Sequence, residues 1–594
     1  MVGRVVEVNG PLVTAELAGV ATGEQVRIGK LELTGEVIAR LGAKALIQVY
    51  EPTESLRPGE PAEALGHPLS VELGPGLLGG IFDGVQRPLL EQTKQYGDYI
   101  PRGGHLSPLD RRRVWRFEPR PQLKVGGRVA QGEVLGTVQE TKSILHRILV
   151  PPDVRGELTE IAAASDVTVD AVIARVRTDN GAISQLRLFH RWPVRSPRPY
   201  RQRDNAVAPL ITGQRVLDTF FPLVKGGRAA VPGPFGAGKT MVQQQIARWA
   251  DADIVIYVGC GERGNEMVDI LESFPSLTDP NTGRSLMERT LLVANTSNMP
   301  VVAREASIYV GATLAEYYRD QGYDVVMVAD STSRWAEALR EVAGRQGQMP
   351  VEEGYPAYLA SRLAAFYERA GRVTTLSGAS GSITMIGAVS PPGGDFSEPV
   401  TSHTKEIVET FWGLSKELAD ARHYPAVDWV ESFSGYVASC SAWWAKHVDP
   451  RWQELRDIAL GILSQADELA RIANLVGPEA LSPQQRWTLE GAALLKEGVL
   501  QQSALDPLDS YCSPKKQFVL LEQMLAIYRQ GLGVLDLGVS VQELLRLPLL
   551  ASARRLKGSY ANDQMEGMRE FAAKVDAEFS RLATEYVAQS KARQ

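Results

Sequence analysis

Residues 233–240 carry the motif that most restricts the folds open to this chain. Their sequence, GPFGAGKT, matches the pattern G-x-x-x-x-G-K-[ST] at every fixed position. Glycines let a backbone curl so that successive N–H groups point at phosphate oxygens. A short apolar strand candidate at 229–231 precedes the motif, and a segment of helical character follows it. The pattern therefore predicts a strand, a phosphate-binding loop and a helix. The loop residues are Gly233, Pro234, Phe235, Gly236, Ala237, Gly238, Lys239 and Thr240.

A second motif lies where a nucleotide site needs it. Asp330 ends the buried run 325–329, at the carboxyl end of a predicted central strand, where Mg²⁺ is held directly or through water. Lys239 is expected to neutralise the β- and γ-phosphates, and the Thr240 hydroxyl to coordinate the metal. Taken alone, the loop could be a chance glycine-rich turn and Asp330 a helix N-cap. Together they indicate a site for ATP or ADP with Mg²⁺.

Hydrolysis also needs a group that orients or deprotonates the attacking water. Glu262 follows the β-branched run 254–258, in a glycine-flanked segment that reads Gly-Cys-Gly-Glu-Arg-Gly. Ligands of open α/β sheets sit at such strand ends, so Glu262 is the candidate base. Arg263 beside it could stabilise charge or orient the loop. From position alone, both residues could equally be loop surface.

The chain divides by pattern into four parts. Short strands with Gly/Pro punctuation predict a small β-barrel, and a similar stretch further on predicts a β-rich insertion. Strands alternating with helices predict a multidomain α/β protein whose core is a parallel sheet, and the remainder is helical. The expected boundaries are 1–70 for the barrel, 71–109 and 191–435 for the core, 110–190 for the insertion and 436–594 for the helical domain.

Composition excludes several classes of function. The 594 residues carry 64 Lys and Arg against 70 Asp and Glu, a formal charge of −6, which does not favour a nucleic-acid partner. Three cysteines cannot form a disulfide framework and suit a reducing compartment. No apolar run approaches the ~20 residues of a membrane-spanning helix. We therefore expect a cytoplasmic chain.

Several segments together resemble the catalytic A subunit of the V-type (archaeal and bacterial A/V-type) ATPases. They are GPFGAGKT, VGCGERGNEM at 258–267, ADSTSRWAEALRE at 329–341, EEGYPAYLASRLAAFYERAG at 352–371 and GAVSPPGGDFSEPVT at 387–401. The resemblance covers nearly the whole chain. It implies a RecA-like core, with the 110–190 insertion separating A subunits from the shorter β subunits of F-type enzymes.

The resemblance also implies partners and roles. The A subunit alternates with a non-catalytic B-type subunit in a hexameric ring, with ATP at their interface and an arginine finger supplied by B. Central and peripheral stalk subunits link the ring to a membrane sector that moves H⁺ or Na⁺, so the chain would be peripheral to a membrane. Glu262 matches the water-activating residue and Arg334 matches an arginine that lines the site.

The adenine pocket is implied by the resemblance with one departure. Tyr424 matches an aromatic residue that stacks on the base. The family usually has a second aromatic residue where this sequence has Leu505. An aliphatic side chain can pack on the ring but loses aromatic stacking.

Two other functions compete with the rotary ATPase. One is a nucleotide-binding subunit that does no chemistry, but the complete set of Lys239, Thr240, Glu262 and Asp330 argues against it. The other is a related hexameric ATPase without ion transport, of the secretion or translocase type. A secretion ATPase would be expected to lack the 110–190 insertion, and a translocase would need a basic nucleic-acid-binding domain.

Overall fold

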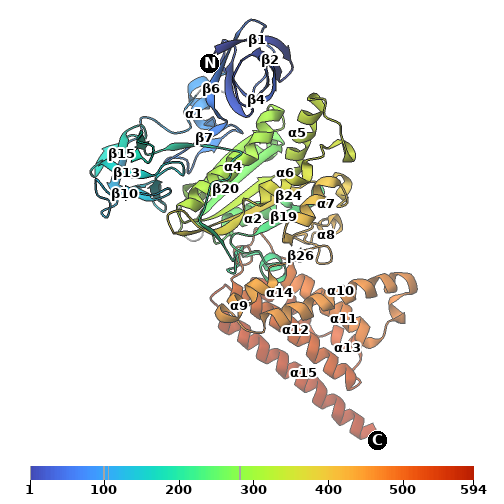
Figure 1. The fold of residues 1–594 in the computed structure, drawn as a ribbon. Coiled ribbons are helices and arrows are strands. Elements are labelled where there is room, and N and C mark those ends of the chain that lie inside the picture. The colour runs from blue at the N-terminus through green and yellow to red at the C-terminus, as the bar shows by residue number, and fades with distance from the viewer. Residues whose placement is uncertain (1, 98–100, 105, 280–281, 594) are drawn as a thin grey trace.

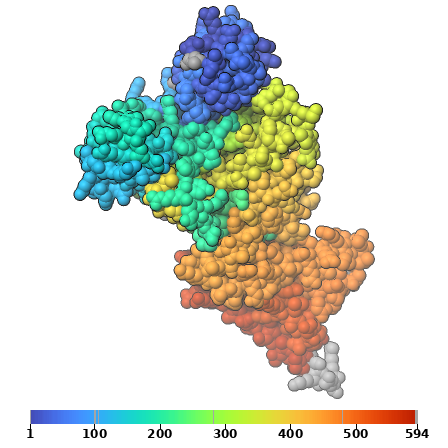
Figure 2. Space-filling view, in the orientation of Figure 1, coloured from blue at the N-terminus to red at the C-terminus, as the bar shows by residue number. Residues whose placement is uncertain are grey.

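The computed structural model describes residues 2–97, 101–104, 106–279 and 282–593. A barrel stands at one end of the molecule, a central sheet with helices lies in the middle, and a helical domain forms the other end (Figure 1). A β-rich lobe projects from the side of the centre. Figure 2 shows the barrel and this lobe as separate masses on the central core. The predicted class is confirmed.

The N-terminal barrel is closed and has six strands in the order β1-β2-β5-β4-β3-β6. Small and β-branched side chains such as Val13, Val26 and Ile47 fill its interior. Alternation along each strand places these residues inside and the charged ones outside. The strands are β1 (Val2–Asn9), β2 (Leu12–Glu16), β3 (Glu24–Ile28), β4 (Leu33–Leu41), β5 (Lys44–Val49) and β6 (Pro61–Pro68).

The side lobe consists of two four-stranded antiparallel sheets. One sheet runs in the order β12-β11-β9-β14 and the other in the order β10-β13-β15-β16. A two-stranded pair of β17 with β7 follows the lobe and leads back to the core. The strands are β7 (Ser70–Leu73), β9 (Trp115–Pro119), β10 (Arg128–Val129), β11 (Val134–Gln139), β12 (Leu145–Leu149), β13 (Gly156–Ile161), β14 (Ser165–Val167), β15 (Val172–Thr178), β16 (Ile183–Arg187) and β17 (His190–Pro193).

The core is a mostly parallel sheet covered by helices. Its strands run in the order β26-β25-β19-β24-β22-β20-β21-β8, with β18 and β23 off this path. The strands are β8 (Ile81–Phe82), β18 (Gln202–Asp204), β19 (Arg228–Pro232), β20 (Ile254–Glu262), β21 (Thr290–Thr296), β22 (Asp324–Asp330), β23 (Gly371–Thr374), β24 (Ser380–Val389), β25 (Thr410–Phe411) and β26 (Phe433–Ser434). The helices are α1 (Leu89–Tyr96), η1 (Val216–Phe220), α2 (Lys239–Trp249), α3 (Gly264–Ser276), η2 (Leu286–Arg289), α4 (Val301–Asp320), α5 (Thr332–Arg345), η3 (Glu352–Gly354), α6 (Leu359–Tyr367), η4 (Pro392–Gly394), α7 (Pro399–Ile407) and α8 (Lys416–Asp420).

Strand order brings four strand ends together. β19, β24, β22 and β20 are consecutive neighbours and all run parallel. Their carboxyl ends therefore share one edge of the sheet, the edge at which α/β proteins bind ligands. β24 separates the strand that enters the phosphate-binding loop from the strand that ends in Asp330. The residues after β19, β22 and β20 are thereby placed around one space.

The helical domain begins with α9 and ends with the long α15 (Figure 1). Ser482 caps α11 with a capping box to Gln485, and Ser513 caps α12. No helix among the described residues is both long and apolar enough to cross a membrane. The helices are α9 (Val437–His447), α10 (Trp452–Val476), η5 (Pro478–Ala480), α11 (Pro483–Leu495), η6 (Lys496–Leu500), α12 (Pro514–Asp536), α13 (Val541–Leu545), α14 (Pro548–Ser559) and α15 (Met565–Arg593).

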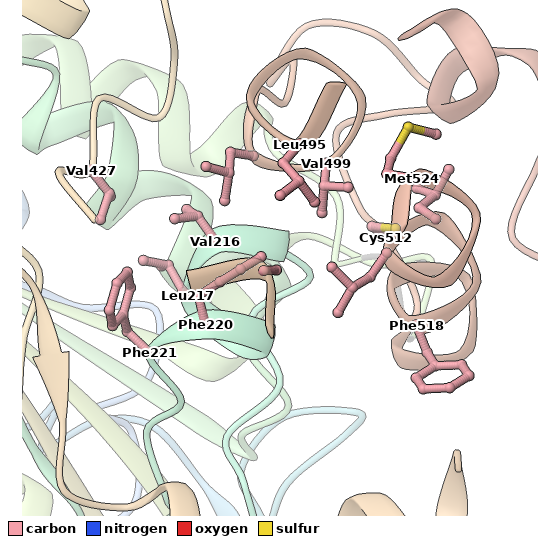
Figure 3. Packing of buried hydrophobic residues seen from close by; sticks show 14 of the residues in the cluster. Val216, Leu217, Phe220, Phe221, Val427, Leu495, Val499, Cys512, Phe518 and Met524 are labelled. Atoms are coloured by element: carbon pink, nitrogen blue, oxygen red, sulfur yellow. The ribbon is translucent and has the colours of Figure 1, made fainter. Parts of the chain in front are cut away.

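Core and helical domain share one apolar cluster. Figure 3 shows Val216, Leu217 and Phe220 of η1 near Leu495 and Val499, which belong to α11 and η6. All five side chains are buried. A buried Gln517 of α12 also donates to the Asp218 carboxylate of η1 at 2.8 Å. The two domains are therefore joined by a continuous packed interior, not by a flexible linker.

Candidate nucleotide site

The phosphate-binding loop connects the end of β19 to the start of α2, as predicted. Gly236 and Gly238 have φ angles of +83° and +89°, a region that strains other residues. A Cβ atom on Gly233 would lie 2.7 Å from the Cβ of Leu414. Two glycines thus shape the turn and the third lets the chain pack closely. The N–H groups of the first turn of α2 remain available to an anion.

Lys239 is the first residue of α2 and stays beside the loop. Its Nζ donates to the Gly233 carbonyl at 2.7 Å and contacts the Pro234 carbonyl at 3.5 Å. Burial lowers the pKa of Lys239, while the nearby carboxylates of Asp330 and Glu262 act in the opposite direction. The ammonium group is held by weak carbonyl partners, which phosphate oxygens could replace with stronger charge-assisted bonds.

Asp330 ends β22 inside the protein. Its side chain is buried, and its Oδ2 accepts a hydrogen bond of 2.9 Å from the Tyr257 hydroxyl. Burial raises the pKa of Asp330, and the Tyr257 hydrogen bond and the charge of Lys239 offset that rise only in part. The carboxylate is therefore short of compensating positive charge, a condition that a cation relieves.

Glu262 is the last residue of β20, the neighbour of β22. Burial, the Asp330 carboxylate and a hydrogen bond with Glu266 all raise the pKa of Glu262. The preceding Gly261 has a φ angle of +73°, and a Cβ atom there would lie 2.7 Å from Cδ of Arg304. That glycine lets the chain turn so that Glu262 and Asp330 lie in one acidic group. A basic, partly buried carboxylate of this kind suits proton abstraction.

The donor set at this edge fits Mg²⁺. The metal prefers oxygen ligands and is bound by one or two carboxylates together with substrate phosphates. Asp330 offers a buried carboxylate, and Thr240 offers a hydroxyl on the first turn of α2. Burial is the main cause of the raised pKa values of Asp330 and Glu262, and at Asp330 the charge of Lys239 offsets the rise only in part, so a divalent cation would stabilise both carboxylates.

Two predicted arginines lie around this acidic group. The Arg263 guanidinium lies 4.6 Å from the centre of the Phe235 ring, and that ring is 75% exposed on the phosphate-binding loop. Arg334, on the first turn of α5, donates to both carboxylate oxygens of Glu337 at 2.8 and 2.9 Å. Glu337 and the charge of Glu262 raise the pKa of Arg334 despite partial burial. Both arginines are therefore ordered by neighbours of the site.

A cavity of about 860 Å³ extends from the start of α2 toward the helical domain. Tyr424 and Leu505 both line it together with Gly238, so the structure brings the two adenine-pocket candidates to the phosphate-binding loop. Tyr424 is 43% exposed and Leu505 is 90% exposed. A planar base could pack on the Tyr424 ring, whereas Leu505 projects at the mouth of the cavity.

Several residues of this cavity were not predicted. Met241, Val242 and Gln245 extend the phosphate-binding motif along α2, and a helical reading of the motif could have indicated them. Arg555 and Lys557 come from α14, more than 300 residues further along the chain. No local pattern in the sequence connects α14 with the loop at 233–240.

Four family models each match a different segment of this chain. Residues 213–434 match the ATP synthase alpha/beta family nucleotide-binding domain, and 2–66 match the beta-barrel domain of that family. Residues 106–195 match the alpha/beta subunit barrel-sandwich domain, and 441–541 match the C-terminal domain of V and A type ATP synthase. Fold and site thus define an ATP synthase alpha/beta-type chain.

Individual relatives show which branch of this class the chain belongs to. The V-type ATP synthase alpha chain of Nitrosococcus oceani is 68% identical over 99% of this chain and 100% of its own length. The A-type ATP synthase subunits A of Thermococcus kodakarensis and Methanopyrus kandleri are 52% and 53% identical over 98% of this chain and 100% and 99% of their own lengths. The chain belongs to the family of V-type and A-type ATP synthase A subunits.

A more distant structure shares the fold. The ATPase EscN of the enteropathogenic E. coli type III secretion system superposes with a TM-score of 0.62 at 21% identity, covering 88% of this chain and 100% of EscN. Identity at that level supports a common fold alone. The full-length relatives favour the rotary ATPase prediction over the secretion alternative.

Proposed function

We propose that this chain is the catalytic subunit of a rotary V/A-type ATPase, which hydrolyses or synthesises Mg-ATP. One observation carries the proposal. Lys239 at the start of α2 lies at the same edge of the sheet as Asp330 and Glu262, which end the neighbouring strands β22 and β20, in a chain that belongs to the A-subunit family. A subunit that only bound nucleotide would not need the buried, basic carboxylate of Glu262 beside the other two groups.

The residues divide the chemistry among them. The backbone of 233–238 and the ammonium of Lys239 bind the phosphates. Thr240 and Asp330 would hold Mg²⁺, which when bound neutralises charge that develops on the phosphate oxygens. Glu262 accepts a hydrogen bond or a proton from the attacking water. Arg263 and Arg334 stabilise negative charge around the transferred phosphoryl group.

The partners follow from the family to which this chain belongs. We propose that a B-type subunit binds beside the site in an alternating hexameric ring and supplies a further arginine. Central and peripheral stalk subunits would couple the ring to a membrane sector that moves H⁺ or Na⁺. The chain itself would then be attached to the membrane only through these subunits, and no nucleic acid takes part.

Leu505 gives a test of the adenine pocket. Replacing Leu505 with Phe is expected to tighten ATP binding by up to about tenfold or to leave it unchanged, because an aromatic ring adds about 0.5–1.5 kcal/mol of stacking. The measurement is the Kd of ATP by isothermal titration, with Leu475→Phe as a control at an exposed leucine of α10. Marked weakening by Leu505→Phe would show that this residue does not border the base.

Nucleotide stoichiometry tests the proposed function on the chain alone. Equilibrium titration with Mg-ATP is expected to show one site per chain, with inorganic tripolyphosphate competing for it because the phosphates occupy the loop at 233–240. Removal of Mg²⁺ by a chelator is expected to weaken binding. A chain that is folded by circular dichroism yet binds neither ATP nor tripolyphosphate would contradict the proposal.

A further inference from the structure

Two cationic side chains from distant parts of the chain meet at the end of η6. Arg215 donates through Nε to the Val499 carbonyl at 2.6 Å and through Nη2 to the Gln501 carbonyl at 2.7 Å. Lys557 of α14 donates through Nζ to the Gln501 carbonyl at 2.7 Å and to the Glu497 carbonyl at 2.6 Å. The carbonyls at a helix end have no partner within the helix, so these cations satisfy them. Gln501 is the shared point of attachment.

The segment that starts at Gln501 forms one wall of the 860 Å³ cavity. Residues 501–506 line the cavity together with Tyr424. The Gln502 N–H donates to the Tyr424 carbonyl at 2.8 Å, which ties this wall to the aromatic residue across from it. Asp509 closes the segment by accepting from Ser503 N–H at 2.8 Å and from Arg215 at 2.6 Å. A shift at Gln501 would therefore move both sides of the adenine pocket.

Lys557 differs from Arg215 in how firmly it is placed. Arg215 is fully buried directly before η1, where its guanidinium bonds to the end of η6. Lys557 is only partly buried and itself lines the cavity. Its flexible stem reaches from a separate helix, α14, and its two hydrogen bonds connect that helix to the cavity wall.

We propose that Lys557 is a positioning residue for the adenosine half of the nucleotide site. Its ammonium group holds the Gln501 carbonyl and so sets the position of the 501–506 wall against Tyr424. This inference depends on the proposed function, because it assumes that the base enters this cavity. The phosphate half of the site, formed by the loop at 233–240, does not depend on Lys557.

Electrostatics make this link sensitive to pH. Burial lowers the pKa of Lys557 to about 8; the charge of Arg215 lowers it further, and Asp509 and Glu497 oppose the shift. Lys557 is thus charged at pH 7 and loses its charge as the pH rises through about 8, and charged donors form the stronger hydrogen bonds. Adenosine affinity should be greatest below pH 8 and should fall above it. The charged or titratable neighbours are Arg215, Asp509, Glu497, Glu490, Arg554, Lys496 and His423.

Three of these neighbours, Arg215, Asp509 and His423, keep one charge state across this range. The pKa of Arg215 is raised, so its guanidinium stays charged, and the pKa of Asp509 is lowered, so its carboxylate stays ionised. Burial and nearby lysines lower the pKa of His423 to about 4, so the ring is neutral. The Lys557 variants described below then assign a change in adenosine affinity between pH 7 and 9.5 to Lys557.

The experiment compares two ligands on the full-length chain. Isothermal titration gives the Kd of Mg-ATP and of Mg-tripolyphosphate at pH values from 7.0 to 9.5. Tripolyphosphate has a second terminal phosphate and ionises differently from ATP, so the ratio of the two Kd values is compared with the same ratio in Lys557→Arg. That comparison removes the pH effects on the phosphates, on Mg²⁺ and on Lys239 and leaves the contribution of Lys557. In the unchanged chain we expect Mg-ATP to bind more tightly than Mg-tripolyphosphate at pH 7. The ratio of the Kd of tripolyphosphate to the Kd of ATP should then fall about fivefold to tenfold by pH 9.5, with a midpoint near 8.

Three variants separate positioning from general stability. Lys557→Met is expected to weaken ATP binding at pH 7 by about tenfold, to leave tripolyphosphate binding unchanged and to remove the part of the pH dependence of the ratio that comes from Lys557. Lys557→Arg keeps donors that do not titrate, so it should bind ATP as tightly as the unchanged chain at pH 7 and should lack the part of the pH dependence that comes from Lys557. Lys446→Met, at an exposed lysine near the end of α9, is the matched control and should behave as the unchanged chain.

Two results would overturn the inference. One is that the ratio of the two Kd values is the same in Lys557→Met as in the unchanged chain. The other is a pH dependence in Lys557→Arg equal to that of the unchanged chain. Failure of the proposed function looks different, because in that case tripolyphosphate would not bind to the unchanged chain at all.

Discussion

Replacing Glu262 with Gln is expected to lower ATP turnover by about 10²- to 10⁴-fold while the affinity for Mg-nucleotide stays near that of the unchanged chain. Gln has nearly the same size and hydrogen-bonding reach but cannot accept a proton at neutral pH. Burial and the nearby carboxylates of Asp330 and Glu266 raise the pKa of Glu262 to about 8. Gln therefore resembles the uncharged form that Glu262 has at neutral pH before Mg-nucleotide binds, and the substitution should not disturb the fold.

The measurement is phosphate release by the assembled ring, together with the Kd of Mg-ATP. Glu272→Gln is a matched control, because Glu272 is an exposed residue of α3, the helix that follows the Glu262 loop. The control should retain full turnover. Turnover of the Glu262→Gln ring within a few-fold of normal would show that another group activates the water.

Replacing Lys239 with Ala is expected to impair binding and turnover together. The Lys239 ammonium is partly buried at the loop, and loss of a buried charged partner costs about 2–5 kcal/mol, on the order of 10²-fold or more in Kd. Equilibrium titration with ATP, tripolyphosphate and adenosine resolves where the loss occurs. Both phosphate ligands should weaken, whereas adenosine, which has no phosphate, should bind as before.

The two variants are informative as a pair. Glu262→Gln should separate binding from chemistry, and Lys239→Ala should not. An ATP Kd within twofold of normal in Lys239→Ala would contradict the assignment of the phosphate site to the loop at 233–240. Thermal unfolding of both variants should match that of the unchanged chain, because neither residue packs in the apolar core.

Contiguous features of the site could be predicted from the sequence. The loop at 233–240 is specified by its own residues, since its glycines set the backbone and its lysine starts the helix. Asp330 and Glu262 were predicted at strand ends, and the structure makes β20 and β22 neighbours, so the two carboxylates approach each other. The carboxyl ends of parallel strands lie at one edge of a sheet, and this general rule was sufficient to predict that Asp330 and Glu262 lie at the same edge.

Features that depend on distant packing could not be predicted. Nothing in the sequence places β24 between β19 and β22, or Lys557 beside Gln501. Tyr424 and Leu505 were assigned only through the family resemblance, because adenine is recognised by shape and not by a contiguous motif. Apolar residues at helical spacing define one face of α10, yet Ile472 and Val476 on that face are 40% and 61% exposed. Periodicity defines a face but not the length over which other helices cover it.

The central claim is that this chain supplies a catalytic site, which a B-type partner completes. Phosphate release from Mg-ATP tests it directly, measured for the purified chain, for a folded B-type partner and for the two mixed. We predict that sustained turnover appears only in the mixture and is lost when the chain carries Glu262→Gln. Assembly of the mixed ring without turnover would contradict the claim, as would equal turnover by this chain alone.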